Sequence, residues 1–175
     1  MGVPAVMTTF RTILAGALAL AISTPVAAQT CLQPAEQTAF SVRALQSQLM
    51  VVALSCGQHD QYNAFVTRNQ RELGQAYRQV AGHFRRVHGA SGQRQLDQYI
   101  TTLANAQSQE GIRQGSHFCQ NAASLFQQAL VAKPDLAGLA ALSSSQAVPN
   151  PYSPAACPVR TAQAARPTQI AAAAR

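Results

Sequence analysis

The sequence predicts a small all-α protein: an antiparallel helical bundle of about four helices with two disulfides and a disordered tail rich in proline and alanine. Three observations lead to this prediction. Apolar residues recur at intervals of three and four along most of the chain, which is the period of an amphipathic helix. The chain carries four cysteines, an even number that suits two disulfides in an oxidising compartment. Short stretches between the helical segments favour antiparallel neighbours.

Residues 1–28 are expected to be a cleaved signal peptide. Arg11 precedes an uncharged apolar run over residues 13–22, and Pro25 and the small residues 26–28 follow it. A positive residue, a short apolar segment and a small-residue site are typical of a secretory signal. The run is shorter than the roughly 20 residues that cross a bilayer. We therefore expect a periplasmic or secreted chain without a transmembrane segment after cleavage.

The first expected helix begins at Pro34, a residue that suits the first turn, and ends at Gly57. Its apolar face consists of Val42, Leu45, Leu49, Val52 and Cys56. Since these residues repeat at alternating intervals of three and four, they share one side of a helix.

The second expected helix runs from Asp60 to Gly89. Asp60 is a candidate cap, because its carboxylate can accept hydrogen bonds from the first backbone N–H groups. The helix is least favoured at Gly74 and Gly82, since each glycine costs about 1 kcal/mol relative to alanine.

A third helix is expected after Ser91, which is its candidate cap. A stretch containing glutamine, serine and glycine should separate it from a fourth helix, which includes Ile112 and Cys119 and ends at residues 133–134. Residues 136–142 add a short fifth turn. The helical domain is therefore expected to span residues 29–142.

From residue 143 to residue 175 the composition changes. Five prolines lie among serine, alanine, glutamine and arginine. Because so little apolar bulk is present to offset the entropy of ordering, we expect a flexible tail. Cys157 is its one expected tether.

Helix geometry selects one cysteine pairing. If residues 34–56 form one helix, Cys31 and Cys56 lie roughly 30 Å apart, whereas a disulfide needs Cα atoms within about 7 Å. An antiparallel bundle brings Cys56 near Cys119, and Cys31 near the point where the tail carrying Cys157 emerges. No two cysteines have the close spacing of a structural zinc site. We therefore expect disulfides Cys56–Cys119 and Cys31–Cys157.

The most organised polar feature is a set of arginines in the second expected helix. Arg71, Arg78 and Arg85 recur every seven residues, and Arg68 lies one turn earlier. They fall on one side of a helix, opposite its apolar face. This set predicts binding to an anionic surface: an envelope polymer, a lipid headgroup or an acidic partner protein. The alternative is an ordinary solvated helix face.

Other chemistry has weaker support. Glu36 and Glu72 are expected on solvated faces, and no phosphate-binding glycine loop or nucleophile elbow occurs, so we expect no enzymatic activity and no cofactor. His83 and His88 point about 140° apart on one helix, so we expect no metal site and surface or capping roles for the histidines. No recognition motif accompanies the positive charge, and we expect no nucleic acid partner.

Several aromatic residues offer an alternative function. They would line an apolar pocket between the helices of a carrier or sensor for a small ligand, although aromatics at helical spacing also fill an ordinary core. The residues are Tyr62, Phe65, Tyr77, Phe84, Tyr99, Phe118 and Phe126.

Several short strings resemble a group of small secreted or periplasmic helical proteins of alphaproteobacteria. The strings lie within residues 40–130 and are Leu54-Ser55-Cys56-Gly57, Tyr62-Asn63-Ala64-Phe65-Val66, Leu103-Ala104-Asn105 and Phe118-Cys119. The resemblance implies export and a core that contains Cys56 and Cys119, and it implies no activity. We therefore expect a non-enzymatic exported protein that acts through its basic helix face.

Overall fold

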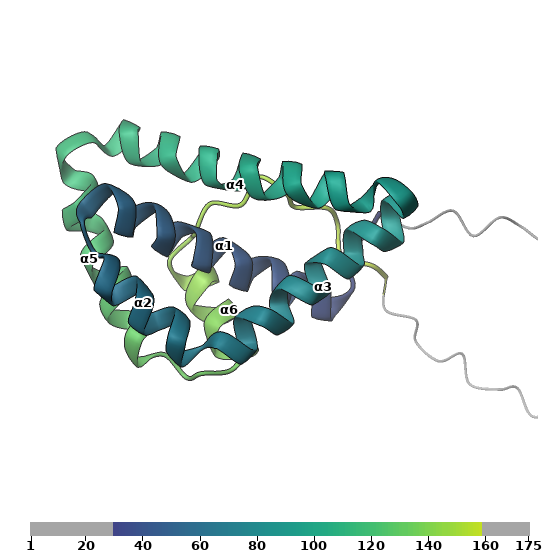
Figure 1. Ribbon diagram of the computed structural model, residues 1–175, viewed down its shortest axis with the longest axis horizontal. Helices are drawn as coiled ribbons and strands as arrows, with labels where there is room; N and C mark the ends of the chain where they lie inside the picture. Colours follow the sequence, from purple (N-terminus) through teal and green to yellow (C-terminus); the bar gives the residue numbers. More distant parts are fainter. Residues whose placement is uncertain (1–29, 159–175) are drawn as a thin grey trace, which may run out of the picture.

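The structure is a computed structural model that describes residues 30–158. These residues form an all-α fold with two disulfides, as predicted (Figure 1). The α-helices are α1 (Pro34–Cys56), α2 (His59–Arg68), α3 (Gln70–His88), α4 (Gly92–Gln114), α5 (Phe118–Val131) and α6 (Leu136–Ser145). Two short 3-10 helices, η1 (Gly89–Ser91) and η2 (Gly115–His117), connect α3 to α4 and α4 to α5. The expected signal peptide lies outside the described residues.

Helix α1 is the centre of the fold. It begins with Pro34 in its first turn and stops at Gly57, as predicted. Gly57 caps the helix in a left-handed conformation with φ 70°. It packs against α3, α4 and α6, so apolar residues around most of its circumference are buried. Among the described helices, α1 alone is long and apolar enough to cross a membrane by length and composition. Its burial explains this composition, since the central helix of a bundle contacts apolar side chains on several sides.

The prediction of one continuous helix from Asp60 to Gly89 is wrong, because the helix breaks at Asn69. Asn69 is buried, and its Nδ2 donates a hydrogen bond to the Phe65 carbonyl oxygen at 2.9 Å. An asparagine side chain that bonds to the backbone competes with helical hydrogen bonding. The chain therefore turns between α2 and α3 (Figure 1). Gly74 and Gly82, the expected weak points, lie inside the unbroken α3.

Two predicted caps are also wrong. Asp60 lies inside the first turn of α2, which begins one residue earlier. Ser91 precedes α4 but makes no side-chain cap; its hydroxyl donates to the His88 carbonyl oxygen at 3.0 Å instead. Asp135 caps α6 in the expected way, since its Oδ1 accepts from the Gly138 N–H at 2.7 Å at the start of that helix.

The boundary between the third and fourth predicted helices lies later than expected. The polar stretch after residue 106 continues α4, and Ile112 belongs to α4, where it is 77% exposed. The chain turns at Gly115, whose φ of 57° is a conformation that glycine adopts readily. Gly111 stays helical and lies against Phe118, with only 3.1 Å between the ring and the place of an added Cβ. Glycine at that position lets α5 begin close to α4.

Both predicted disulfides are confirmed. Cys31 and Cys157 have Cα atoms 4.8 Å apart, and Cys56 and Cys119 have Cα atoms 5.6 Å apart. Because the first pair lies at the start of α1 and the second at its end, the bonds join the chain at opposite ends of the central helix.

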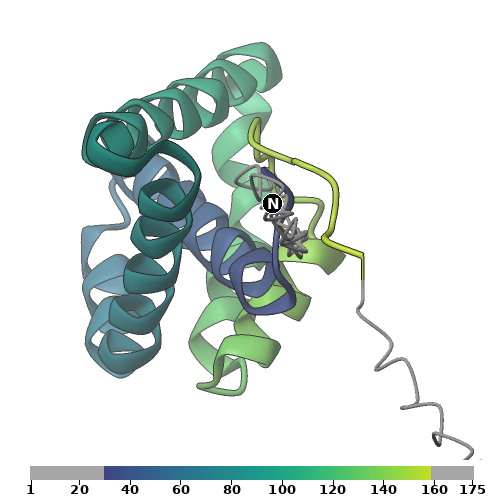
Figure 2. The same ribbon diagram turned by 90° about the vertical axis from the view of Figure 1, so that its right-hand side faces the viewer.

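The predicted start of the flexible tail at residue 143 is wrong for the described part of that segment. Helix α6 continues to Ser145, and residues 146–158 return along the helices to the start of α1 (Figure 2). Leu32 N–H donates to the Ala155 carbonyl oxygen at 2.9 Å, and Cys157 N–H donates to the Leu32 carbonyl oxygen at 2.8 Å. These bonds, with the disulfide, order a proline-rich segment that buries little apolar bulk. The rest of the expected tail lies outside the described residues.

Candidate functional site

Three of the four predicted arginines share one exposed face of α3. Arg71, Arg78 and Arg85 are all exposed, and their spacing of seven residues keeps them within about 40° around the helix axis. Among residues 30–158, no carboxylate forms an ion pair with Arg78 or Arg85, while Arg71 Nε lies 3.0 Å from Glu72 Oε1. We call these three arginines the α3 basic face.

Arg68 is not part of this face, because the break at Asn69 places it at the end of α2. Its guanidinium donates to the carbonyl oxygen of Leu130 and, at 3.3 Å, to that of Ala132. These carbonyls lie at the C-terminal end of α5, where helix carbonyls lack intrahelical donors and favour a positive charge. Arg68 therefore joins α2 to α5.

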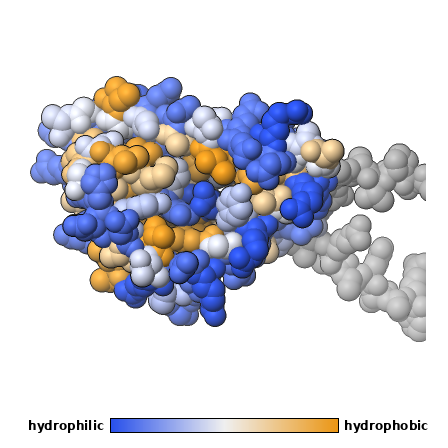
Figure 3. All heavy atoms as spheres, in the orientation of Figure 1, coloured by the Kyte–Doolittle hydropathy of each residue, from blue (hydrophilic) through white to orange (hydrophobic). Residues whose placement is uncertain are grey.

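The α3 basic face ends at a depression between α3 and α4. Arg85 borders this depression, which has a volume of about 470 Å³ and is also lined by Ala81 and Leu96. Gly92 permits the close approach of the two helices, since an added Cβ would lie 2.8 Å from the Arg85 Cα. In Figure 3, hydrophilic residues dominate the right-hand part of the visible face, and hydrophobic residues are more frequent towards the opposite end.

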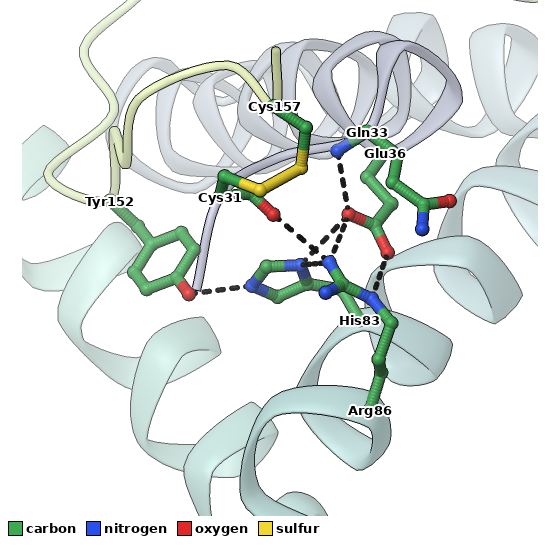
Figure 4. Close-up of a disulfide and its surroundings, with 7 residues drawn as sticks. All are labelled: Cys31, Gln33, Glu36, His83, Arg86, Tyr152 and Cys157. Carbon is green, nitrogen blue, oxygen red and sulfur yellow. Dashed lines mark hydrogen bonds and ion pairs between the residues drawn. A yellow bond between two sulfur atoms is a disulfide. The ribbon is translucent and has the colours of Figure 1, made fainter. Parts of the chain in front are cut away.

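A buried polar cluster lies beside the Cys31–Cys157 disulfide (Figure 4). Glu36 from α1 receives two bonds from Arg86 of α3: Nε donates to Oε1 at 3.1 Å, and Nη2 donates to Oε2 at 2.7 Å. His83 Nδ1 lies 3.0 Å from Glu36 Oε2, and His83 Nε2 lies 2.6 Å from the Tyr152 hydroxyl. Arg86 Nη2 also donates to the Cys31 carbonyl oxygen at 3.0 Å. The cluster therefore connects α1, α3 and both described ends of the chain.

The expectation that Glu36, Glu72 and His83 face solvent is wrong, since Glu72 is also buried. Glu36 is 8% exposed and His83 is 0% exposed. Burial alone would raise the pKa of Glu36, but the hydrogen bonds from Arg86, the Gln33 N–H and His83 hold this pKa below its usual value. Burial lowers the pKa of His83, against the opposing effect of Glu36. The cluster thus favours an ionised Glu36 beside a neutral imidazole.

A carboxylate, an imidazole and a hydroxyl in series are also the components of a nucleophilic triad. Here the terminal hydroxyl belongs to Tyr152, and burial, together with the charge of Glu36, raises its pKa. The phenol stays protonated, and the His83 ring that would take its proton is fully buried. The geometry therefore suits a structural junction better than a nucleophile.

Sequence reasoning missed this cluster, although one signal was present. Glu36 lies three residues after Gln33, the spacing of a capping box, and its Oε2 accepts from the Gln33 N–H at 2.9 Å. That spacing places Glu36 at the first turn of α1. Its second role, as partner of His83 and Arg86, depends on how α3 packs on α1.

The remaining predicted groups lie apart from one another. Within residues 30–158, no three histidine, cysteine or carboxylate side chains gather as metal ligands would. The aromatic residues considered for an apolar pocket are mostly core: Phe65, Phe84 and Phe126 are at most 2% exposed. Phe84 also lines a cavity of about 280 Å³ with Tyr99 and Tyr152.

Comparison of the chain with family models, curated proteins and solved structures finds no match. A function can therefore be proposed only from the geometry of the described residues.

Proposed function

We propose that this chain is a non-enzymatic periplasmic or secreted protein that binds an anionic component of the cell envelope through the α3 basic face. The proposed partner is a lipid headgroup, an anionic envelope polymer or an acidic protein. The observation that carries the proposal is the exposure of Arg71, Arg78 and Arg85 on one helix face, two of them without a carboxylate partner among the described residues. Guanidinium groups in such positions are available for paired hydrogen bonds to phosphate or carboxylate oxygens.

The rest of the chain supports this proposal. Two disulfides suit an oxidising compartment outside the cytoplasm. Of the 13 basic residues, one lies in the expected signal peptide, while all six acidic residues follow it. The excess of positive charge favours encounter with anionic surfaces. The depression beside Arg85 adds an apolar border to the basic face, which suits a headgroup attached to an apolar chain.

The test is retention of the exported chain on vesicles that contain phosphatidylglycerol, at low salt. The triple variant Arg71→Gln, Arg78→Gln and Arg85→Gln should bind about 100-fold more weakly, since each basic residue near an anionic surface contributes about 1 kcal/mol. The matched control removes the same charge from exposed residues elsewhere and is Arg94→Gln, Arg113→Gln and Lys133→Gln. Equal loss in both variants would show attraction by net charge alone and contradict a specific face.

A further inference from the structure

A second candidate site lies away from the α3 basic face, in a cavity between α1, α4, α5 and residues 146–149. Its volume is about 330 Å³. Pockets for small molecules usually have volumes of about 300–1,000 Å³, so this cavity suits a ligand at the small end of that range. Gln48 from α1, Gln114 from α4 and Asn121 from α5 supply amide groups to its lining, and Phe118 supplies an aromatic ring.

An unpaired buried amide lies at this cavity. Gln48 is 7% exposed, and its Oε1 is buried without a hydrogen-bond partner among the described residues. Buried polar atoms are normally satisfied, so this oxygen points to a bound molecule as the missing donor. Ala147, which also lines the cavity, has a φ of 46° because α6 ends there: the N–H groups of Ala147 and Val148 donate to the carbonyl oxygens of Ser144 and Ser143, the pattern of a Schellman motif.

The hydrogen bonds around the cavity define the kind of ligand. Glu110 is the one charged residue in its lining, and the exposed Arg113 pairs with it, so the cavity carries little net charge. Gln114 Nε2 donates to Glu110 Oε1 at 3.1 Å, and Asn121 Nδ2 donates to Gln114 Oε1 at 3.0 Å. Because a carboxylate only accepts, it fixes the direction of this chain. The Asn121 Oδ1 is left as an acceptor that receives no hydrogen bond within residues 30–158.

We propose that this cavity binds a small uncharged molecule with several hydroxyl donors, of the size of a monosaccharide. Its hydroxyl groups would donate to the amide oxygens, and its C–H face would lie towards Phe118. The absence of an uncompensated charge in the lining disfavours ionic ligands, because a buried charge requires a partner.

The test is the melting temperature of the full exported chain as D-glucose or N-acetyl-D-glucosamine is added, with lysine and glucuronate as charged comparison probes. A ligand that binds the folded chain raises the melting temperature as its concentration rises. We expect this rise with an uncharged sugar and not with the charged probes. Each probe is added to about 10 mM, which exceeds about a 50-fold molar excess over the chain. The proposal would be overturned if neither sugar raised the melting temperature at that concentration, or if a charged probe raised it equally.

Two variants separate the site from the fold. Gln48→Leu should raise the melting temperature of the free chain, because it removes the unpaired amide, and should abolish the further rise with sugar. Gln120→Leu, an exposed position of α5 outside the cavity lining, should keep the full rise. Sugar binding that survives in Gln48→Leu would overturn the site. The triple variant of the α3 basic face should bind sugar normally, so the two proposals can fail independently.

Discussion

His83 is held by hydrogen-bonding groups on both sides of its ring. Its Nδ1 lies 3.0 Å from the Glu36 carboxylate, and its Nε2 lies 2.6 Å from the Tyr152 hydroxyl. A neutral imidazole satisfies both contacts, since Nδ1–H donates to Glu36 and Nε2 accepts from Tyr152. Arg86 already balances the charge of Glu36, so a proton added to His83 would place an extra positive charge in a buried site. Such a charge is unfavourable unless it is paired.

We therefore expect the free energy of unfolding to decrease as the pH falls from neutral through about 6.5, the usual pKa of histidine. Burial holds the pKa of His83 below that value in the folded chain. Between the two pKa values the unfolded chain binds more protons, and stability falls with pH. Urea denaturation at a series of pH values measures this slope. The slope should be smaller in His83→Gln and unchanged in His117→Gln, which alters an exposed residue of η2. An unchanged slope in His83→Gln would contradict the assignment.

At the scale of single residues, the sequence predicted the disulfide partners better than the hydrogen-bond partners of buried polar side chains. The cysteine pairing followed from helix length, because a helix separates its two ends by a known distance. The contact between Glu36 and His83 joins residues 47 positions apart. Whether a polar residue on a helix meets another depends on the rotation and register of both helices, which side-chain packing sets.

At the scale of helices, periodicity predicted the helical segments and most of their buried residues, although Ile112 is exposed. It did not predict where the helices break. Gly82 lies inside α3, whereas the chain turns at Gly115. The same residue type has opposite roles because glycine permits a left-handed turn but does not impose one. The break at Asn69 comes from a side chain that bonds to the Phe65 carbonyl. Neither the turn at Gly115 nor the break at Asn69 changes the spacing of three and four residues between apolar positions, so this spacing could not predict them.

The same substitution at the two glycines should therefore have opposite effects. Gly115→Ala should destabilise the chain by about 2 kcal/mol, because φ 57° strains a residue with a Cβ. Gly82→Ala should stabilise it by about 1 kcal/mol, because alanine is the better helix former. An added Cβ meets nothing within 4 Å at either position, so packing does not obscure the comparison. Urea denaturation of both variants measures whether the free energy of unfolding rises or falls in each. Destabilisation by Gly82→Ala would contradict this account.

At the scale of the whole molecule, residues 146–158 close the fold by returning to its N-terminal side. Average composition predicted a flexible tail, because prolines and small residues bury little surface. A few specific contacts hold the described part instead. Tyr152 stacks on Phe40 with ring centroids 4.9 Å apart, and Leu32 exchanges main-chain bonds with residues 155 and 157. Composition averages over such contacts, so the ordered part of the segment could not be predicted from it.

Loss of the Cys31–Cys157 bond should therefore destabilise the chain more than loss of Cys56–Cys119. The bonded cysteines are 126 and 63 residues apart, respectively. Because a disulfide constrains the unfolded chain, each bond should add about 4–5 kcal/mol to the free energy of unfolding. The loop closed by Cys31–Cys157 is twice as long, which accounts for a difference of only about 0.6 kcal/mol. Without the Cys31–Cys157 bond, residues 146–158 should also be released and Tyr152 should no longer be held against His83. This release should lower the free energy of unfolding further.

Urea denaturation of the Cys31→Ala/Cys157→Ala and Cys56→Ala/Cys119→Ala variants compares the two bonds, and amide hydrogen exchange reports on the segment itself. The Leu32 amide donates to the Ala155 carbonyl oxygen in the native chain. It should therefore lose protection when Cys31 and Cys157 are replaced and keep it when Cys56 and Cys119 are replaced. If Leu32 stays protected in both variants, the hydrogen bonds and the stacking of Tyr152 are sufficient to order residues 146–158, and the disulfide acts mainly on the unfolded chain.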